Sequence, residues 1–125
     1  MAHFYRAINQ SKRTVLCEKL EVAETVAEKS RGLLGRDRLD SGAGMLFEGM
    51  VASAWLHMFF MRFPIDIVFL DKVGRVMRIN ANLRPWQVSS VVLGARKALE
   101  LEAGATTRSG TSLNDIVTLE RVLVS

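Results

Sequence analysis

The 125-residue chain is poor in the residues that carry most catalytic and metal chemistry: it has one cysteine, Cys17, and two histidines. A single cysteine excludes an internal disulfide and a cysteine-rich zinc site. No basic cluster adjoins Cys17 to stabilise a thiolate, so we expect a small buried hydrophobic side chain there. Because His3 lies near the start of the chain, His57 is the histidine placed for acid–base chemistry, and a serine or cysteine hydrolase is not expected.

The chain also lacks glycine-rich phosphate loops and long apolar runs. Neither a dinucleotide-binding pattern nor a Walker pattern occurs among its nine glycines. No apolar run reaches about 18 residues, and residues 1–20 lack the apolar centre of a signal peptide. We therefore expect a cytoplasmic protein without a membrane partner, although a removed leader would leave no trace in the sequence. No cofactor and no metal are expected.

The composition is that of an ordinary globular protein. Apolar residues make up 49% of the chain and charged residues 24%, and the net charge is +4. This length suits one folded unit with a real core, so we expect a single domain over residues 1–125.

Short segments of alternating apolar and polar residues, separated by turn signals, indicate β-structure. The expected strands cover residues 4–7, 13–22, 45–47, 53–60, 65–70, 75–81, 97–101 and 116–122. Thr25 and Glu28 match a capping box and Gly35 suits a helix end, which predicts one short α-helix near residues 25–34. One further helical turn could begin at Thr106. The fold class predicted is mainly β, a small β-sandwich or jelly-roll-like barrel of about eight strands.

The central stretch Leu56–Asp71 is apolar and rich in aromatic residues and methionines, yet it contains His57, Arg62 and Asp66. Its second half is apolar on both alternating faces except at Asp66, which is typical of an internal strand that keeps one polar group inside. A buried polar group needs a partner. A structural salt bridge of Asp66 with Arg62 or Arg36 is the simplest interpretation.

Charged and polar residues around these strands form the candidate ligand-binding site. Its members are Arg31, Arg36, His57, Arg62, Asp66, Trp86 and Glu100, with Trp86 on the rim. Cations beside carboxylates suit a small anionic or polyhydroxylated ligand, or the end of a peptide. We therefore expect a non-catalytic binding domain.

Two alternatives from other classes stay open. The first is a hydrolase or lyase that uses His57 or Asp66 as general base; Glu100 is a further carboxylate whose pKa burial could raise. The second is a protein-interaction module in which the polar cluster is purely structural. Neither the oligomeric state nor a catalytic residue follows from the sequence.

Two more specific interpretations are weaker. His57, Met58 and Met61 are residue types that bind copper(I), but on one strand Met58 would face away from the other two. Phe59 and Phe60, with Trp86, resemble a base-stacking platform, but aromatic residues in apolar runs are usually core. We expect neither copper nor a nucleic-acid partner.

Spaced motifs run through most of the chain: Ser30–Arg36, Gly44–Phe47, Met61–Asp71, Gly74–Val76, Pro85, Leu99–Leu101 and Ala103–Gly104. In identity and order they resemble the bacterial and archaeal family called domain of unknown function 192. The resemblance implies a compact β domain of sandwich or jelly-roll character with one short helix. It implies no activity, because the family is uncharacterised, and some relatives carry export signals.

Two motifs depart from the family pattern. Where the family often has Trp-Met-Lys-Asn-Thr, this chain has Leu56–Arg62, which changes any site built from that strand. The usual Gly-Asp near the end appears as Asn114–Asp115. Asparagine tolerates the left-handed conformation, so we expect the turn to form.

Overall fold

The computed structural model describes residues 3–23, 36–48, 53–54, 61–90 and 92–123. The strands are β1 (His3–Asn9), β2 (Thr14–Ala23), β3 (Ala43–Glu48), β4 (Ser53–Ala54), β5 (Ile65–Leu70), β6 (Val76–Leu83), β7 (Val92–Leu93), β8 (Lys97–Glu102) and β9 (Val117–Leu123). The helix within these ranges is α2 (Ala105–Ser109). The mainly β prediction is confirmed. The helix expected near residues 25–34 lies outside the described residues.

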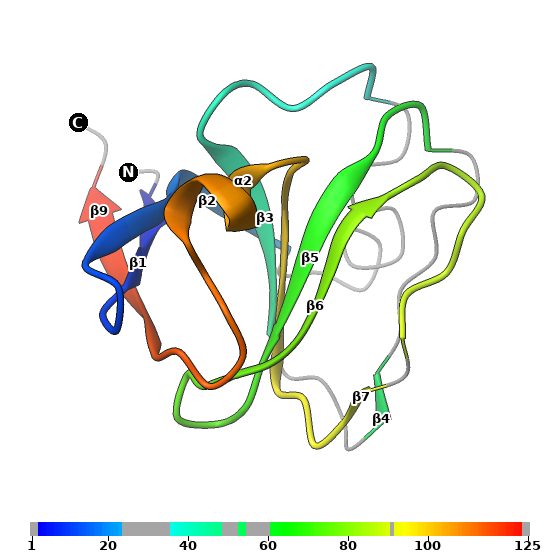
Figure 1. Cartoon of the computed structure of the whole chain (residues 1–125). Helices are drawn as coiled ribbons and strands as arrows, with labels where there is room; N and C mark the ends of the chain where they lie inside the picture. The colour runs from blue at the N-terminus through cyan, green and yellow to red at the C-terminus, as the bar shows by residue number, and fades with distance from the viewer. Residues whose placement is uncertain (1–2, 24–35, 49–52, 55–60, 91, 124–125) are drawn as a thin grey trace.

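One curled sheet holds most of the strands, in the order β6-β5-β8-β3-β2-β1-β9 (Figure 1). The pairing of β2 with β3 is parallel, and the other pairings in this sheet are antiparallel. β4 and β7 form a separate two-stranded sheet. The described strands thus form one open, curled sheet and one small two-stranded sheet, a simpler layout than the expected sandwich or jelly roll. Strand number and spacing alone do not fix how strands divide among sheets.

The two edge strands of the curled sheet meet at one corner. An isolated bridge joins Arg75 to Ile116, just before β6 and β9 begin. The Val117 N–H donates to the Gly74 carbonyl at 2.8 Å. Gly74 has a φ of 89°, and a Cβ at this position would lie 2.4 Å from the Val117 carbonyl oxygen, so only glycine fits the corner.

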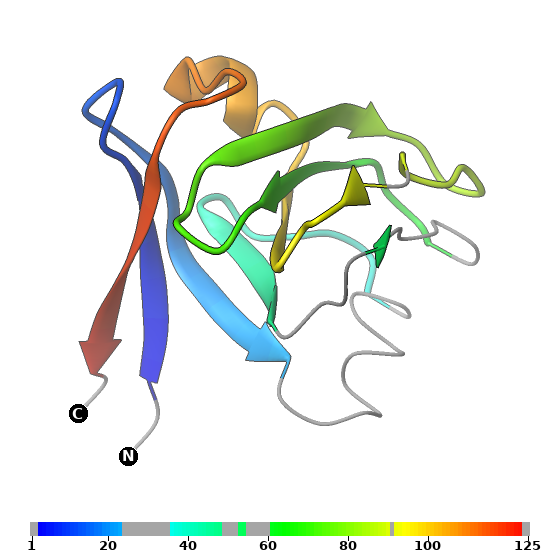
Figure 2. The same ribbon diagram turned by 90° about the horizontal axis from the view of Figure 1, so that it is seen from below.

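The two faces of the sheet bury separate apolar clusters. The inner cluster lies within the curl and comprises Ala7, Leu16, Cys17, Leu20, Leu46, Val68, Leu70, Val76, Leu99, Leu101, Ala105 and Val117. The outer cluster, on the other face, comprises Ala23, Met45, Phe47, Met61, Ile65, Ile67, Phe69, Val92, Ala95 and Ala98. β4 and β7 lie on the same side of the molecule as β5 and β6, away from β1 and β9 (Figure 2). β5 contributes side chains to both clusters, and every residue in it is therefore buried, as the sequence predicted.

The turns before β6 and before β9 form as the sequence predicted. The Asp71 carboxylate accepts hydrogen bonds from the N–H groups of Val73 and Arg75, both at 2.9 Å, and so builds the turn into β6. Asn114 has a φ of 73°, the left-handed conformation expected where the family has glycine. Within the described ranges, no helix is long and apolar enough to cross a membrane.

Candidate functional site

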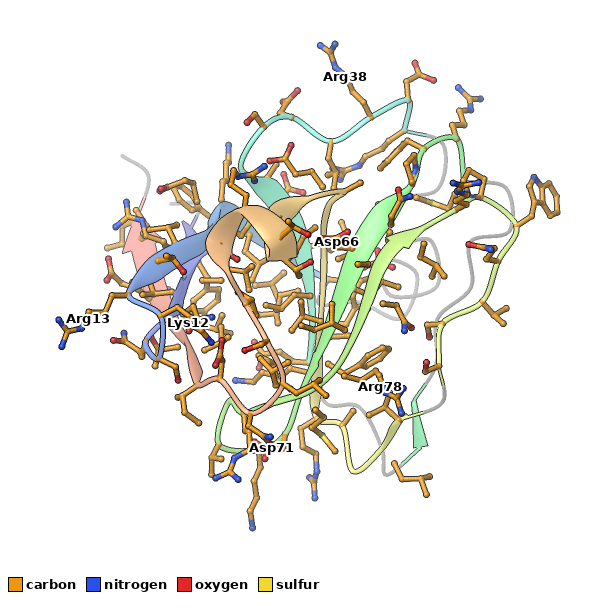
Figure 3. The ribbon with its side chains drawn as sticks, in the orientation of Figure 1. Lys12, Arg13, Arg38, Asp66, Asp71 and Arg78 are labelled. Atoms are coloured by element: carbon orange, nitrogen blue, oxygen red, sulfur yellow. The ribbon has the colours of Figure 1, made fainter. Side chains whose placement is uncertain are left out.

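Asp66 lies on the inner face of β5, beneath α2 (Figure 3), and is 1% exposed. Its Oδ2 accepts hydrogen bonds from the Thr106 N–H at 3.0 Å and the Thr106 hydroxyl at 2.6 Å. Its Oδ1 accepts the Asn82 N–H at 2.8 Å. The carboxylate therefore fastens the start of α2 and the end of β6 to the middle of the sheet.

The arginines expected to pair with Asp66 bind other carboxylates. Arg36 contacts Glu21 at 3.2 Å and Arg62 contacts Asp37 at 2.6 Å. The interpretation of Asp66 as one half of a salt bridge with either arginine is thus wrong. Backbone N–H groups and a hydroxyl satisfy this carboxylate instead.

Glu100 lies on β8 on the opposite face of the sheet from Asp66. Its register partners, Met45 on β3 and Ile67 on β5, belong to the outer cluster. Asp66 is paired with Leu101, which belongs to the inner cluster. The two buried carboxylates, expected to meet in one site, are separated by the thickness of the sheet.

Among the described residues, the neighbours of Glu100 on the adjacent strands are apolar. The residue is 6% exposed, and within the described part of the chain no donor makes a hydrogen bond to its carboxylate. Burial raises the pKa of Glu100 from 4.5 to about 7. This carboxyl group can therefore gain or lose a proton near neutral pH.

The structure describes only part of the remaining candidates. Arg31 and His57 lie outside the described residues, as do Met58, Phe59 and Phe60 of the copper and stacking interpretations. Trp86 is 59% exposed, with a φ of 72°, on the connection between β6 and β7. Cys17 is buried as expected, and burial chiefly raises the pKa of its thiol to about 11, which keeps it protonated.

A buried polar network that the sequence did not reveal ties β1 to the segment before β9. The Asn9 amide donates to Asp115 at 2.9 Å and to the Thr111 hydroxyl at 3.0 Å. The Lys12 ammonium contacts Asp115 at 2.8 Å. Desolvation alone would raise the pKa of Asp115, but hydrogen bonds from Asn9, Lys12 and the Ser112 N–H, with the charge of Lys12, lower it to about 2.

A groove of about 360 Å³ lies between β2 and the loop over residues 36–42. Acidic and basic side chains line it in equal number: Glu18, Glu21 and Asp40 against Lys19, Arg36 and Arg38. Arg38 projects from this loop, at the opposite end of the molecule from Arg78 (Figure 3). Of the predicted site residues that the structure describes, only Arg36 lines this groove.

The loop that forms one wall of the groove is fastened at its Gly42 end. The Gly42 carbonyl accepts the N–H groups of both Glu18 and Lys19 at 2.9 Å, and the Gly42 N–H donates to Glu102 at 3.1 Å. Near its other end, Asp37 is held by Arg62. A groove whose wall is already ordered loses less conformational entropy when it binds a ligand.

The charged side chains of the groove can bind a ligand by hydrogen bonds and ion pairs. Among the described residues, no group of three or more histidine, cysteine, aspartate or glutamate side chains is placed to hold a metal ion. The ion-paired side chains of the groove are 43% to 86% exposed, so a ligand could replace their present partners at small cost.

Comparisons with known proteins find relatives that match this chain over most of their length. A UPF0127 protein from Thermococcus sibiricus is 26% identical over 114 residues, which cover 90% of this chain and 73% of the relative. A UPF0127 protein from Pyrococcus abyssi is 30% identical over 107 residues, which cover 78% of this chain and 91% of the relative. Neither name states an activity.

Solved structures share the fold. A protein of unknown function from Novosphingobium aromaticivorans has a TM-score of 0.77 and 29% identity, with 92% of this chain and 83% of that chain covered. A structure from Sinorhizobium meliloti has a TM-score of 0.76, with 94% of each chain covered, and at 23% identity it supports the fold alone.

The family model that matches covers residues 7–119, and its description is an uncharacterized ACR. This match spans both clusters of the core, the polar network and the groove. The chain belongs to the family of domain of unknown function 192, as its motifs indicated.

Proposed function

We propose that this chain is a non-catalytic binding domain, and that its ligand is a small molecule carrying both a positive and a negative charge, such as a dipeptide. The observation that carries this proposal is the groove between β2 and the 36–42 loop, where three acidic and three basic side chains share about 360 Å³. This volume is within the range of pockets that hold small ligands.

The charge balance decides among the ligand classes. A purely anionic ligand would meet Glu18, Glu21 and Asp40 as well as the cations, and their repulsion would offset the attraction. A sugar usually stacks on an aromatic ring, and none of the described lining residues is aromatic. A ligand with an ammonium and a carboxylate can make charge-assisted hydrogen bonds to both kinds of side chain.

Titration of isotopically labelled protein with glycylglycine, sorbitol and inorganic phosphate, followed by amide chemical shifts, tests this proposal. We expect glycylglycine to shift the amides of residues 36–43 and of β2, and to bind more tightly than the other two probes. Arg36→Ala and Arg38→Ala should each weaken its binding about fivefold. The matched control is Arg78→Ala, an equal loss of charge and length outside the groove, which should leave the affinity unchanged.

Each other outcome counts against the proposal. Tighter binding of phosphate or sorbitol in the groove would replace the zwitterionic ligand by an anionic or polyhydroxylated one. If none of the three probes changes the amide chemical shifts of the groove residues, the groove is not the binding site. Equal losses in Arg38→Ala and Arg78→Ala would mean that only overall charge matters.

An enzyme is the second candidate, and Glu100 is the observation that favours it. Both oxygens of Asp66 accept hydrogen bonds from groups that hold the fold together, which is a structural use of this carboxylate. Glu100, with a pKa of about 7, has the protonation behaviour that general acid–base catalysis needs. If the domain is a hydrolase or lyase, its activity should follow a titration near pH 7 that Glu100→Gln removes.

A further inference from the structure

A second hollow of about 200 Å³ adjoins the groove. The two hollows share Glu18, Ser41 and Gly42 in their walls, so they are continuous around the turn that begins β3. The smaller one is below the roughly 300 Å³ at which complete ligand pockets begin, which suits it to one side chain of a larger ligand.

The lining of this second hollow differs from that of the groove. Val15, Leu16 and Cys17 from β2 supply an apolar wall, and Arg108 from the last turn of α2 closes it. Val15 is 44% exposed, although most large apolar side chains of this sheet are buried. Arg108 is held by Glu102 at 2.7 Å. Because Leu16 and Cys17 are buried, Val15 supplies the apolar surface that a ligand could cover.

We infer that the ligand is a dipeptide with an apolar side chain, and that this side chain occupies the second hollow against Val15 while the two charged ends lie in the groove. This inference rests on the proposed function and names its ligand class. The charged groove then supplies affinity for any dipeptide. The second hollow selects among peptides, because covering Val15 removes apolar surface from water only when the ligand brings an apolar group there.

The experiment compares glycylglycine with glycylleucine on the full chain, again by amide chemical shifts. We expect glycylleucine to bind roughly tenfold more tightly and to shift the amides of residues 15–17 in addition to those of the groove. Val15→Thr keeps the shape and β-branching of the side chain but replaces one methyl group by a hydroxyl group, and it should abolish most of this preference without changing the affinity for glycylglycine. Val73→Thr, on the exposed turn before β6, is the matched control and should keep the preference.

The outcomes separate the two claims. Equal affinities for the two dipeptides, with shifts in the groove, would overturn the apolar subsite and leave the proposed function intact. A preference for glycylleucine that survives Val15→Thr would place the leucine side chain elsewhere and also overturn the inference. Failure of both dipeptides to shift the groove would overturn the proposed function and this inference together.

Discussion

The two faces of the central strands treat a buried carboxylate in opposite ways. Asp66 and Glu100 lie on neighbouring strands and are almost equally buried, at 1% and 6% exposed. Asp66 receives three hydrogen bonds, whereas Glu100 faces apolar side chains and has no donor among the described residues. Burial depth therefore says little about a carboxylate until its donors are known. The Asp66 carboxylate on the inner face holds the fold together, whereas the Glu100 carboxyl group on the outer face can change its protonation state near neutral pH.

The largest expected effect is that of removing the inner carboxylate. Asp66→Ala leaves two backbone N–H groups and the Thr106 hydroxyl unpaired in a buried position, and should lower the free energy of unfolding by about 4 kcal/mol. Urea denaturation measures this loss. Asp71→Ala is the control: it also removes a carboxylate that accepts two backbone N–H groups, but in an exposed turn, and should cost about 1 kcal/mol. An equal cost at both positions would remove the distinction between the faces.

The outer carboxylate should behave in the opposite sense. The pKa of Glu100 is 4.5 when unfolded and about 7 when folded, so the folded state holds the extra proton between these values. Its contribution to stability is complete below pH 4.5 and is lost as the pH rises through 7. Glu100→Gln should therefore raise the free energy of unfolding by about 3 kcal/mol at pH 8 and change it little at pH 4.

Denaturation curves across this pH range measure the effect. The control, Glu102→Gln, alters the same strand at a carboxylate that already binds Arg108 and the Gly42 N–H, and it should not stabilise the protein at high pH. A destabilised Glu100→Gln variant at pH 8 would show that the ionised carboxylate of Glu100 stabilises the folded state.

Asp115 extends the comparison to acid pH. Its pKa falls from 3.8 unfolded to about 2 folded, so its contribution to stability is present above pH 3.8 and is lost as the pH falls towards 2. Lys12 is 42% exposed, and solvent screens part of the interaction, so Asp115→Asn should cost about 1 kcal/mol at pH 7. The same variant should flatten the acid limb of the stability curve, and an unchanged limb would contradict the assignment.

The smallest effect is expected from the arginines once expected to neutralise Asp66. Arg62→Ala breaks a 2.6 Å contact with Asp37, but both side chains are more than half exposed, so the cost should be about 0.5 kcal/mol or less. The loss should shrink further in high salt. A cost of several kcal/mol in thermal or urea unfolding would mean that Arg62 supports a buried charge after all.

The strands were predictable because their signals are local. Residues 65–70 are bounded by Pro64 and by the Asp71–Gly74 turn, and β5 has these limits. Alternation in β8 correctly set Glu100 against Leu99 and Leu101. These features depend on side chains a few residues apart, which a single sequence displays.

The candidate site was less predictable because its contacts are distant and partly made by the backbone. Thr106 lies 40 positions from Asp66 and contributes an N–H group that every residue type except proline has. Whether Asp66 and Glu100 share a face depends on the register of β5 against β8, and a shift of one residue would reverse the answer. Asn9 lies outside the strand expected over residues 4–7, and its partner Asp115 lies 106 positions away.

The pairing of β1 with β9 places the first strand of the chain against its last, with His3 opposite Leu123 (Figure 1). The sheet cannot be completed until both have been synthesised, so folding on the ribosome should stall at an incomplete sheet whose β1 edge is bare. Because β1 and β9 are adjacent, the chain is suited to circular permutation. A short linker from residue 123 to residue 3, with new ends opened in an exposed turn such as that at Asp71, should preserve every strand contact described above.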